Sequence, residues 1–255
     1  MKSRLIMVAA IAAPLFANGS AVADPEAEVL HWWTSGGEAK SVAVLQDEFA
    51  SRGGAWTDMP VAGGGGDAAM TALRARVLAG NAPTAVQLKG PSIQEWYEEG
   101  VLADISAVAN ANNWSDVLPE AIARHMKCEG NWCAAPVNVH RIDWIWANAS
   151  VLAKNGIEMP TSWDEFNAAA DKLLEMGITP LAHGGQAWQD ATVFEAVAVG
   201  LGGPEFFRKA FVELDMETLK SDQMKAVFDQ MRRIRGYVDD NFSGRDWNLA
   251  TAMVI

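Results

Sequence analysis

The chain has 255 residues, of which 50% are hydrophobic, and a formal net charge of −12. This length suffices for a large core or for two domains. The negative charge repels nucleic acid and anionic lipid surfaces, so we expect no nucleic-acid partner.

The first 23 residues have the layout of an export signal. Lys2 and Arg4 precede an apolar run at residues 5–16, and Ala21 and Ala23 place small side chains at a cleavage position. The run is too short to anchor the chain in a bilayer. We therefore predict a signal peptide at residues 1–23; the alternative is a buried N-terminal helix.

The rest of the chain alternates predicted strands and helices, which indicates an α/β fold. Strands are predicted at residues 29–33, 56–61, 84–88, 138–147 and 180–182. Helices are predicted at residues 39–50, 67–79, 93–99, 114–126, 150–155, 162–176, 191–200, 204–214 and 221–237. The aromatic-rich strand at 138–147 suits a crossing between two domains. Because the chain ends on an apolar segment at 250–255, we expect further residues beyond it.

Cys128 and Cys133 are the only cysteines. A two-residue turn at Gly130 and Asn131 would place Cys128 opposite Cys133, within disulfide range. An exported protein folds in an oxidising compartment, which favours a disulfide over two free thiols. We expect no metal site, because no second pair of cysteines or histidines has the spacing of zinc ligands.

Tryptophan is unusually frequent, with 11 Trp against 2 Tyr. Its broad apolar face suits the C–H face of a sugar ring, although a core role is the usual alternative for any one tryptophan. Trp32 and Trp33 close a predicted strand, where an open α/β sheet has its ligand crevice. Glu38 begins the next helix, where it can accept hydrogen bonds from sugar hydroxyls or complement the helix dipole.

Three further candidates occupy comparable places. Lys89 follows the strand at 84–88, and Trp188 lies in the loop after the strand at 180–182. His140 lies on the predicted crossing strand and can face a cleft. Exposed surface positions are the alternative for Lys89 and His140, and a core position is the alternative for Trp188.

Catalytic and cofactor motifs are absent from the sequence. The run Gly63–Gly66 lacks the following Lys-Ser/Thr of a phosphate loop, so we predict a flexible connection there. No Gly-x-Ser-x-Gly motif and no paired acid/base motif is visible. We therefore expect a binding protein, with no cofactor and no catalytic residue.

Four segments resemble a known family: residues 28–38 (EVLHWWTSGGE), 78–87 (LAGNAPTAVQ), 135–141 (APVNVHR) and 159–166 (MPTSWDEF). They are similar to the family 1 extracellular solute-binding proteins of ABC importers, in particular to the glucose/mannose-binding type. The Trp-Trp pair with Glu38 is the segment most specific to glucose binding.

The resemblance implies a type II periplasmic-binding-protein fold, with two α/β lobes joined by crossing strands. The N-terminal lobe would span residues 24–137, and residues 138–255 would form an incomplete C-terminal lobe whose chain returns to the first lobe beyond residue 255. In similar proteins the positions of Trp32, Trp33, Glu38 and Lys89 contact the ligand.

The resemblance also implies a monomeric periplasmic protein whose lobes close over a monosaccharide, glucose or mannose, and deliver it to an ABC permease. A secreted carbohydrate-active hydrolase and a chemoreceptor-linked sensor are the alternatives.

Overall fold

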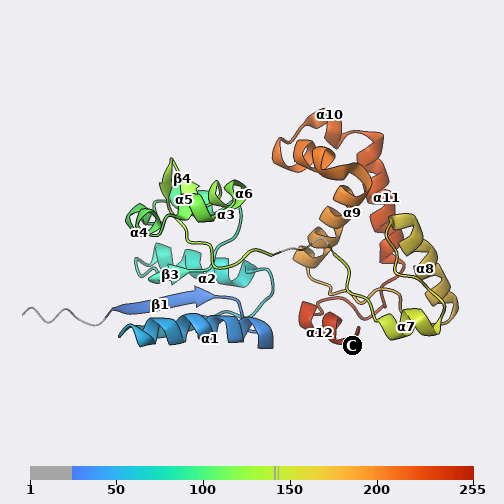
Figure 1. Ribbon diagram of the computed structural model, residues 1–255, viewed down its shortest axis with the longest axis horizontal. Coiled ribbons are helices and arrows are strands. Elements are labelled where there is room, and N and C mark those ends of the chain that lie inside the picture. The colour runs from blue at the N-terminus through green and yellow to red at the C-terminus, as the bar shows by residue number, and fades with distance from the viewer. Residues whose placement is uncertain (1–24, 141, 143) are drawn as a thin grey trace, which may run out of the picture.

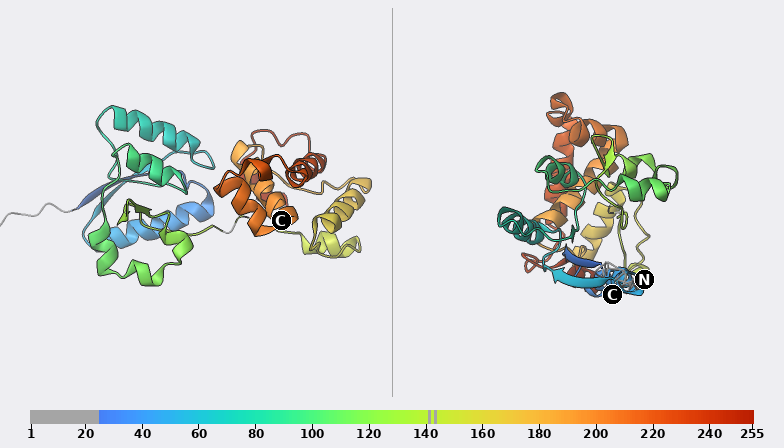
Figure 2. Two further views of the ribbon diagram at one scale, coloured as in Figure 1. Left: turned by 90° about the horizontal axis from the view of Figure 1, so that it is seen from above. Right: turned by 90° about the vertical axis from the view of Figure 1, so that its left-hand side faces the viewer.

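A computed structural model describes residues 25–140, 142 and 144–255. The predicted signal peptide lies outside these residues. Figure 1 shows two groups of elements, one from β1 to β5 and one from α7 to α12, which a stretch without helix or strand connects. The view from above in Figure 2 separates the same two groups.

The N-terminal part is built on a parallel sheet. β1 (Glu26–His31), β2 (Ala55–Pro60) and β3 (Ala85–Val86) lie in the order β2-β1-β3, and both neighbouring pairs are parallel. Parallel neighbours need a crossover between them, which α1 (Gly36–Ser51) and α2 (Asp67–Leu78) provide. The predicted alternation of strand and helix is confirmed in this part.

The core of this part joins the central strand to its crossover helices. Leu30 on β1 and Leu73 on α2 are both 0% exposed. The other buried members of the cluster are Trp32, Trp33, Val42, Ala69 and Trp96. Burial of these side chains is the main stabilising term for the sheet.

Beyond the sheet follow α3 (Ser92–Glu98), α4 (Ser106–Ala111), α5 (Trp114–Val117) and α6 (Glu120–Ala123). The single helix predicted at 114–126 is therefore wrong. Pro119 separates α5 from α6, and Leu118 before it is extended, with φ −95° and ψ 136°. Proline disfavours the helical conformation in the residue that precedes it.

A hairpin of β4 (Lys127–Cys128) and β5 (Asn131–Trp132) lies between the cysteines: Cys128 ends β4, and Cys133 directly follows β5. The predicted turn is wrong by one residue: Cys128 pairs with Asn131, and the turn consists of Glu129 and Gly130, with φ values of 49° and 88°. Positive φ at both positions is typical of the tightest hairpins. A disulfide joins Cys128 to Cys133, whose Cα atoms are 5.8 Å apart.

The regular structure of the C-terminal part is mainly helical. Its helices are α7 (Ala149–Lys154), α8 (Trp163–Glu175), α9 (Ala187–Phe207), α10 (Met216–Leu219), α11 (Asp222–Arg235) and α12 (Trp247–Ala252), with a π-helix, η1, at Arg208–Val212. The predicted break between two helices near residue 203 is confirmed, because Gly203 has φ 76° and ψ 173°. Pro204, which follows it, cannot donate a helical hydrogen bond.

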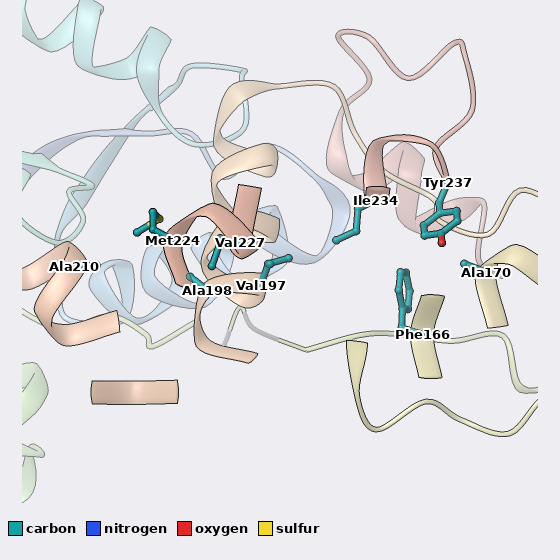
Figure 3. Close-up of a cluster of buried hydrophobic side chains, with 9 residues drawn as sticks. All are labelled: Phe166, Ala170, Val197, Ala198, Ala210, Met224, Val227, Ile234 and Tyr237. Atoms are coloured by element: carbon teal, nitrogen blue, oxygen red, sulfur yellow. The ribbon is translucent and has the colours of Figure 1, made fainter. Parts of the chain in front are cut away.

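The core of the C-terminal part lies between α8, α9 and α11 (Figure 3). Val197 and Val227 are 0% exposed, and Phe166 packs edge-on against Tyr237 with ring centroids 6.0 Å apart. The Tyr237 hydroxyl donates to Asp171 Oδ1 at 2.7 Å. This hydrogen bond satisfies the polar end of an otherwise apolar cluster.

Two predicted strands differ in the structure. The described residues of 138–147 form no strand, because none of them pairs with a neighbouring strand. The segment 180–182 forms one parallel bridge, between Leu181 and Val238. An extended segment becomes a strand only where a second chain segment completes its ladder. Across the described residues, no helix combines the length and the apolar composition needed to cross a membrane.

A buried and an exposed leucine on α2 allow a test of the N-terminal core. Leu73→Ala should lower the free energy of unfolding by about 2–5 kcal/mol, because it removes a fully buried side chain and leaves a cavity. Leu78 is 83% exposed on the same helix. Leu78→Ala should therefore change stability by less than about 0.5 kcal/mol. Urea unfolding of both variants measures the difference, and equal effects would contradict this core.

Candidate functional site

Three loops gather at one edge of the parallel sheet. Trp32 and Trp33 follow β1, the segment Gly63–Gly66 follows β2, and Lys89 follows β3. The carboxyl ends of parallel strands point the same way, so the loops that leave them are neighbours. We call residues Gly63–Gly66 the glycine loop.

Trp32 is held on several sides at this edge. Its backbone N–H donates to Gln87 Oε1 at 3.1 Å, and the Lys89 ammonium lies 5.8 Å from its ring centroid. The ring also lies against Gly66, where an added Cβ would be 2.9 Å from ring atom Cδ2. Trp32 is 8% exposed. It is thus both a core residue and a lining residue of the edge.

Trp33 is fixed through a buried histidine. Its backbone N–H donates to His31 Nδ1 at 3.2 Å, and His31 Nε2 lies 2.9 Å from Asp58 Oδ1. Because Nδ1 accepts, Nε2 carries the proton that is donated to Asp58. The Trp33 ring meets that of His140 edge-on, with centroids 6.3 Å apart. Neighbouring side chains point to opposite faces only within a strand. Because β1 ends at His31, Trp32 and Trp33 can both be buried.

Asp58 receives several hydrogen bonds. Burial alone would raise its pKa, but donation from Trp56 Nε1, His31 and Gln46 stabilises the charged form, so the pKa lies below its ordinary value. The Trp56 and Gln46 donors are both 3.0 Å from Oδ1. The carboxylate thereby ties β2 to α1 and, through His31, to the backbone of Trp33.

Glu38 has a local role in the structure. Its Oε2 accepts from the backbone N–H of Ser35 at 3.3 Å and from the Ser35 hydroxyl at 2.7 Å. These bonds complete a capping box at the start of α1. The alternative of helix-terminus stabilisation therefore accounts for its described contacts.

Trp188 reaches the sheet edge from the C-terminal part. It lies at the start of α9, and its indole N–H donates to Gln186 Oε1 at 2.7 Å. A Cβ added at Gly64 would be 2.9 Å from Trp188 Cζ2, and one added at Gly65 would be 2.7 Å from Cγ. The Lys89 ammonium donates to the carbonyl oxygen of Gly65.

The glycine loop thus contacts Trp32, Lys89 and Trp188, while His140 joins the group through Trp33. The sequence prediction missed the supporting roles of His31 and Gln87. It treated the glycine loop as a flexible connection, whereas the loop packs against two tryptophan rings. Four consecutive glycines shortly after a strand were the available signal for a close approach.

Two cavities lie beside this edge, and both are mainly apolar. One of about 720 Å³ in the C-terminal part is lined by Trp188 and by Trp144, Trp146, Trp163 and Trp247. The other, of about 610 Å³, is lined by Trp33, Trp56 and neighbouring core residues. Neither cavity is lined by Lys89, which at the sheet edge lies beside Trp32 and the glycine loop. We therefore locate the candidate site at the sheet edge.

Within the described ranges, no three His, Cys, Asp or Glu side chains are placed to hold a metal ion.

Comparison with known proteins gives consistent matches along the chain. A family model described as bacterial extracellular solute-binding protein matches residues 39–255. A probable sugar-binding periplasmic protein of Rhizobium meliloti is 54% identical over 252 residues, which cover 99% of this chain and 61% of that protein. A protein of the same description from Brucella melitensis is 57% identical, covering 89% of this chain and 54% of that protein.

Solved structures share the fold at lower identity. A structure from work on xylan utilization by the thermophilic bacterium Caldanaerobius polysaccharolyticus superposes with a TM-score of 0.73 at 18% identity. The match covers 89% of this chain and 58% of that one. The chain thus spans just over half the length of the relatives that it matches.

The Asp58 cluster predicts a specific acid response. Since the folded state holds the pKa of Asp58 below its unfolded value, the carboxylate contributes stability above about pH 4 and loses it as the pH falls through the folded pKa. Asp58→Asn should therefore be less stable than the wild type at pH 6, with the gap narrowing below about pH 4. Urea unfolding across this range measures it. The exposed Asp47→Asn is the control, and a gap independent of pH would contradict the assignment.

Proposed function

The chain belongs to the bacterial extracellular solute-binding protein family, and from that membership and the sheet edge we propose that it captures a sugar for an ABC importer. Its fold is α/β, of the type II periplasmic-binding-protein kind. The exported protein would work in the periplasm as a binding component, without turnover of its ligand. Its partner would be the membrane permease that accepts the sugar.

The convergence of Trp32, Lys89 and Trp188 on the glycine loop is the observation that carries this proposal. Tryptophan faces offer the apolar contact that a sugar ring needs on its C–H faces. A lysine supplies charged donors for ring and hydroxyl oxygens. Trp188 belongs to the C-terminal part and the other two to the N-terminal part, so a ligand here would be enclosed by relative motion of the two.

We propose glucose or mannose as the ligand, because Trp32, Trp33 and Lys89 resemble the residues that contact the ligand in glucose-binding proteins. Glu38 belongs to the same pattern, and its capping bonds to Ser35 hold its carboxylate in a fixed position beside the tryptophans' loop. His140, which meets the Trp33 ring, would complete the polar side of the site.

Isothermal titration of glucose, mannose, galactose and maltose into the protein expressed from its complete gene tests this function. We expect saturable binding of an aldohexose with no new product by chromatography. Binding of none of these sugars would overturn the monosaccharide assignment. Cleavage of maltose would instead indicate a carbohydrate-active hydrolase.

Lys89 gives a test at the level of one side chain. Lys89→Met should weaken sugar binding about tenfold to a hundredfold, because it removes a charged hydrogen-bond donor. The side chain is exposed, so the unfolding temperature should change little. The exposed Lys220→Met in the C-terminal part is the matched control. Wild-type affinity in Lys89→Met would show that Lys89 does not contact the sugar.

A further inference from the structure

The glycine loop has almost no space between its backbone and the tryptophans beside it. An added Cβ would lie 2.9 Å from Trp188 at Gly64, 2.7 Å from Trp188 at Gly65 and 2.9 Å from Trp32 at Gly66. Carbon atoms at optimal separation are about 3.5–4.0 Å apart, so a methyl group does not fit at any of the three positions.

Backbone conformation explains only part of this glycine content. Gly65 and Gly66 have φ values of 81° and 90°, which favour glycine whatever surrounds them. Gly64 is not among the residues with positive φ. Its backbone would accept alanine, and it is the Trp188 ring that excludes a side chain there.

Trp188 is held in place from its own side. Its indole N–H donates to Gln186 Oε1 at 2.7 Å, and Gln186 Nε2 donates in turn to Asp246 Oδ1 at 2.5 Å. Gln186 Oε1 also lies 3.1 Å from the position of a Cβ on Gly64. The ring therefore cannot move away without breaking bonds at the start of α9.

We propose that Gly64 and Gly65 form the docking surface for the Trp188 ring when the two parts of the protein close over a sugar. They are positioning residues: their missing side chains set how close the Trp188 ring comes to Trp32 and to Lys89, whose ammonium is bonded to the same loop. This inference rests on the proposed function, because it assumes that closure traps the ligand. A side chain at Gly64 holds the two parts apart at the site.

Gly64→Ala is the direct test, since it adds one methyl group without backbone strain. We expect the dissociation constant of the bound sugar to rise about tenfold, as for an overpacked contact, while the circular-dichroism spectrum of the folded variant stays that of the wild type. In a Trp188→Leu background the same substitution should have no further effect. The proposed docking surface would be contradicted by wild-type affinity in Gly64→Ala. An equal loss of affinity in the wild-type and Trp188→Leu backgrounds would also contradict it.

Gly80 supplies a control for backbone strain. Its φ of 73° resembles the 81° of Gly65, but no atom lies within 4 Å of an added Cβ. Gly65→Ala should therefore weaken sugar binding more than Gly80→Ala does, although both force a side chain into the left-handed region. Equal losses of sugar affinity in the two variants would assign the loss to backbone strain and contradict the proposed docking surface.

A cross-link tests the contact without any sugar. A Cβ at Gly65 would lie 3.1 Å from Trp188 Cβ, so a shift of about 0.4 Å brings the two carbons to the shortest separation usual in disulfides. The pair Gly65→Cys and Trp188→Cys should form a disulfide detectable by peptide mass spectrometry, whereas Gly80→Cys with Trp188→Cys should not. If the wild type binds no sugar but this bond forms, the proposed function fails and the contact stands. If the Gly65→Cys and Trp188→Cys pair does not cross-link, the proposed docking of Trp188 on the glycine loop is wrong even where sugar binds.

Discussion

The parallel arrangement of β1, β2 and β3 is the constraint on which the site depends. Strands that run the same way end at the same edge, so three loops far apart in sequence become neighbours without any contact being specified between them. Trp32, the glycine loop and Lys89 come together for this reason. The crossover helices α1 and α2 then bury the sheet and fix the edge in place, with Leu30 and Leu73 at the centre of the packing.

Packing and binding share the same side chains at this edge. Trp32 and Trp33 are members of the core cluster, yet they also line the edge that faces the C-terminal part. Such double use makes the ring positions precise, because a core side chain has few alternative rotamers. The His31–Asp58 pair extends this by holding the Trp33 backbone to β2. The glycine loop then lets a third ring, Trp188, approach the same edge.

Sequence patterns predicted the N-terminal sheet and most helices, because periodicity and capping residues act locally. They failed where one residue changes the local geometry: Pro119 divides a predicted helix, and Glu129 takes a left-handed conformation that shifts the hairpin turn. The strand at 138–147 failed for another reason, since a ladder needs a partner that local sequence does not specify. For the site, strand ends pointed to Trp32, Lys89 and Trp188. The packing of Gly64 and Gly65, in contrast, depends on a contact with Trp188, 124 and 123 positions away in sequence, that no local pattern encodes.

Small-angle X-ray scattering with and without the sugar tests the central claim most directly, namely that the two parts close over a ligand at the glycine loop. The protein expressed from its complete gene should show a smaller radius of gyration when the sugar identified by titration is saturating, because the sugar then favours the arrangement in which Trp188 lies on the loop. An unchanged radius at saturation would contradict closure and leave binding to one part alone.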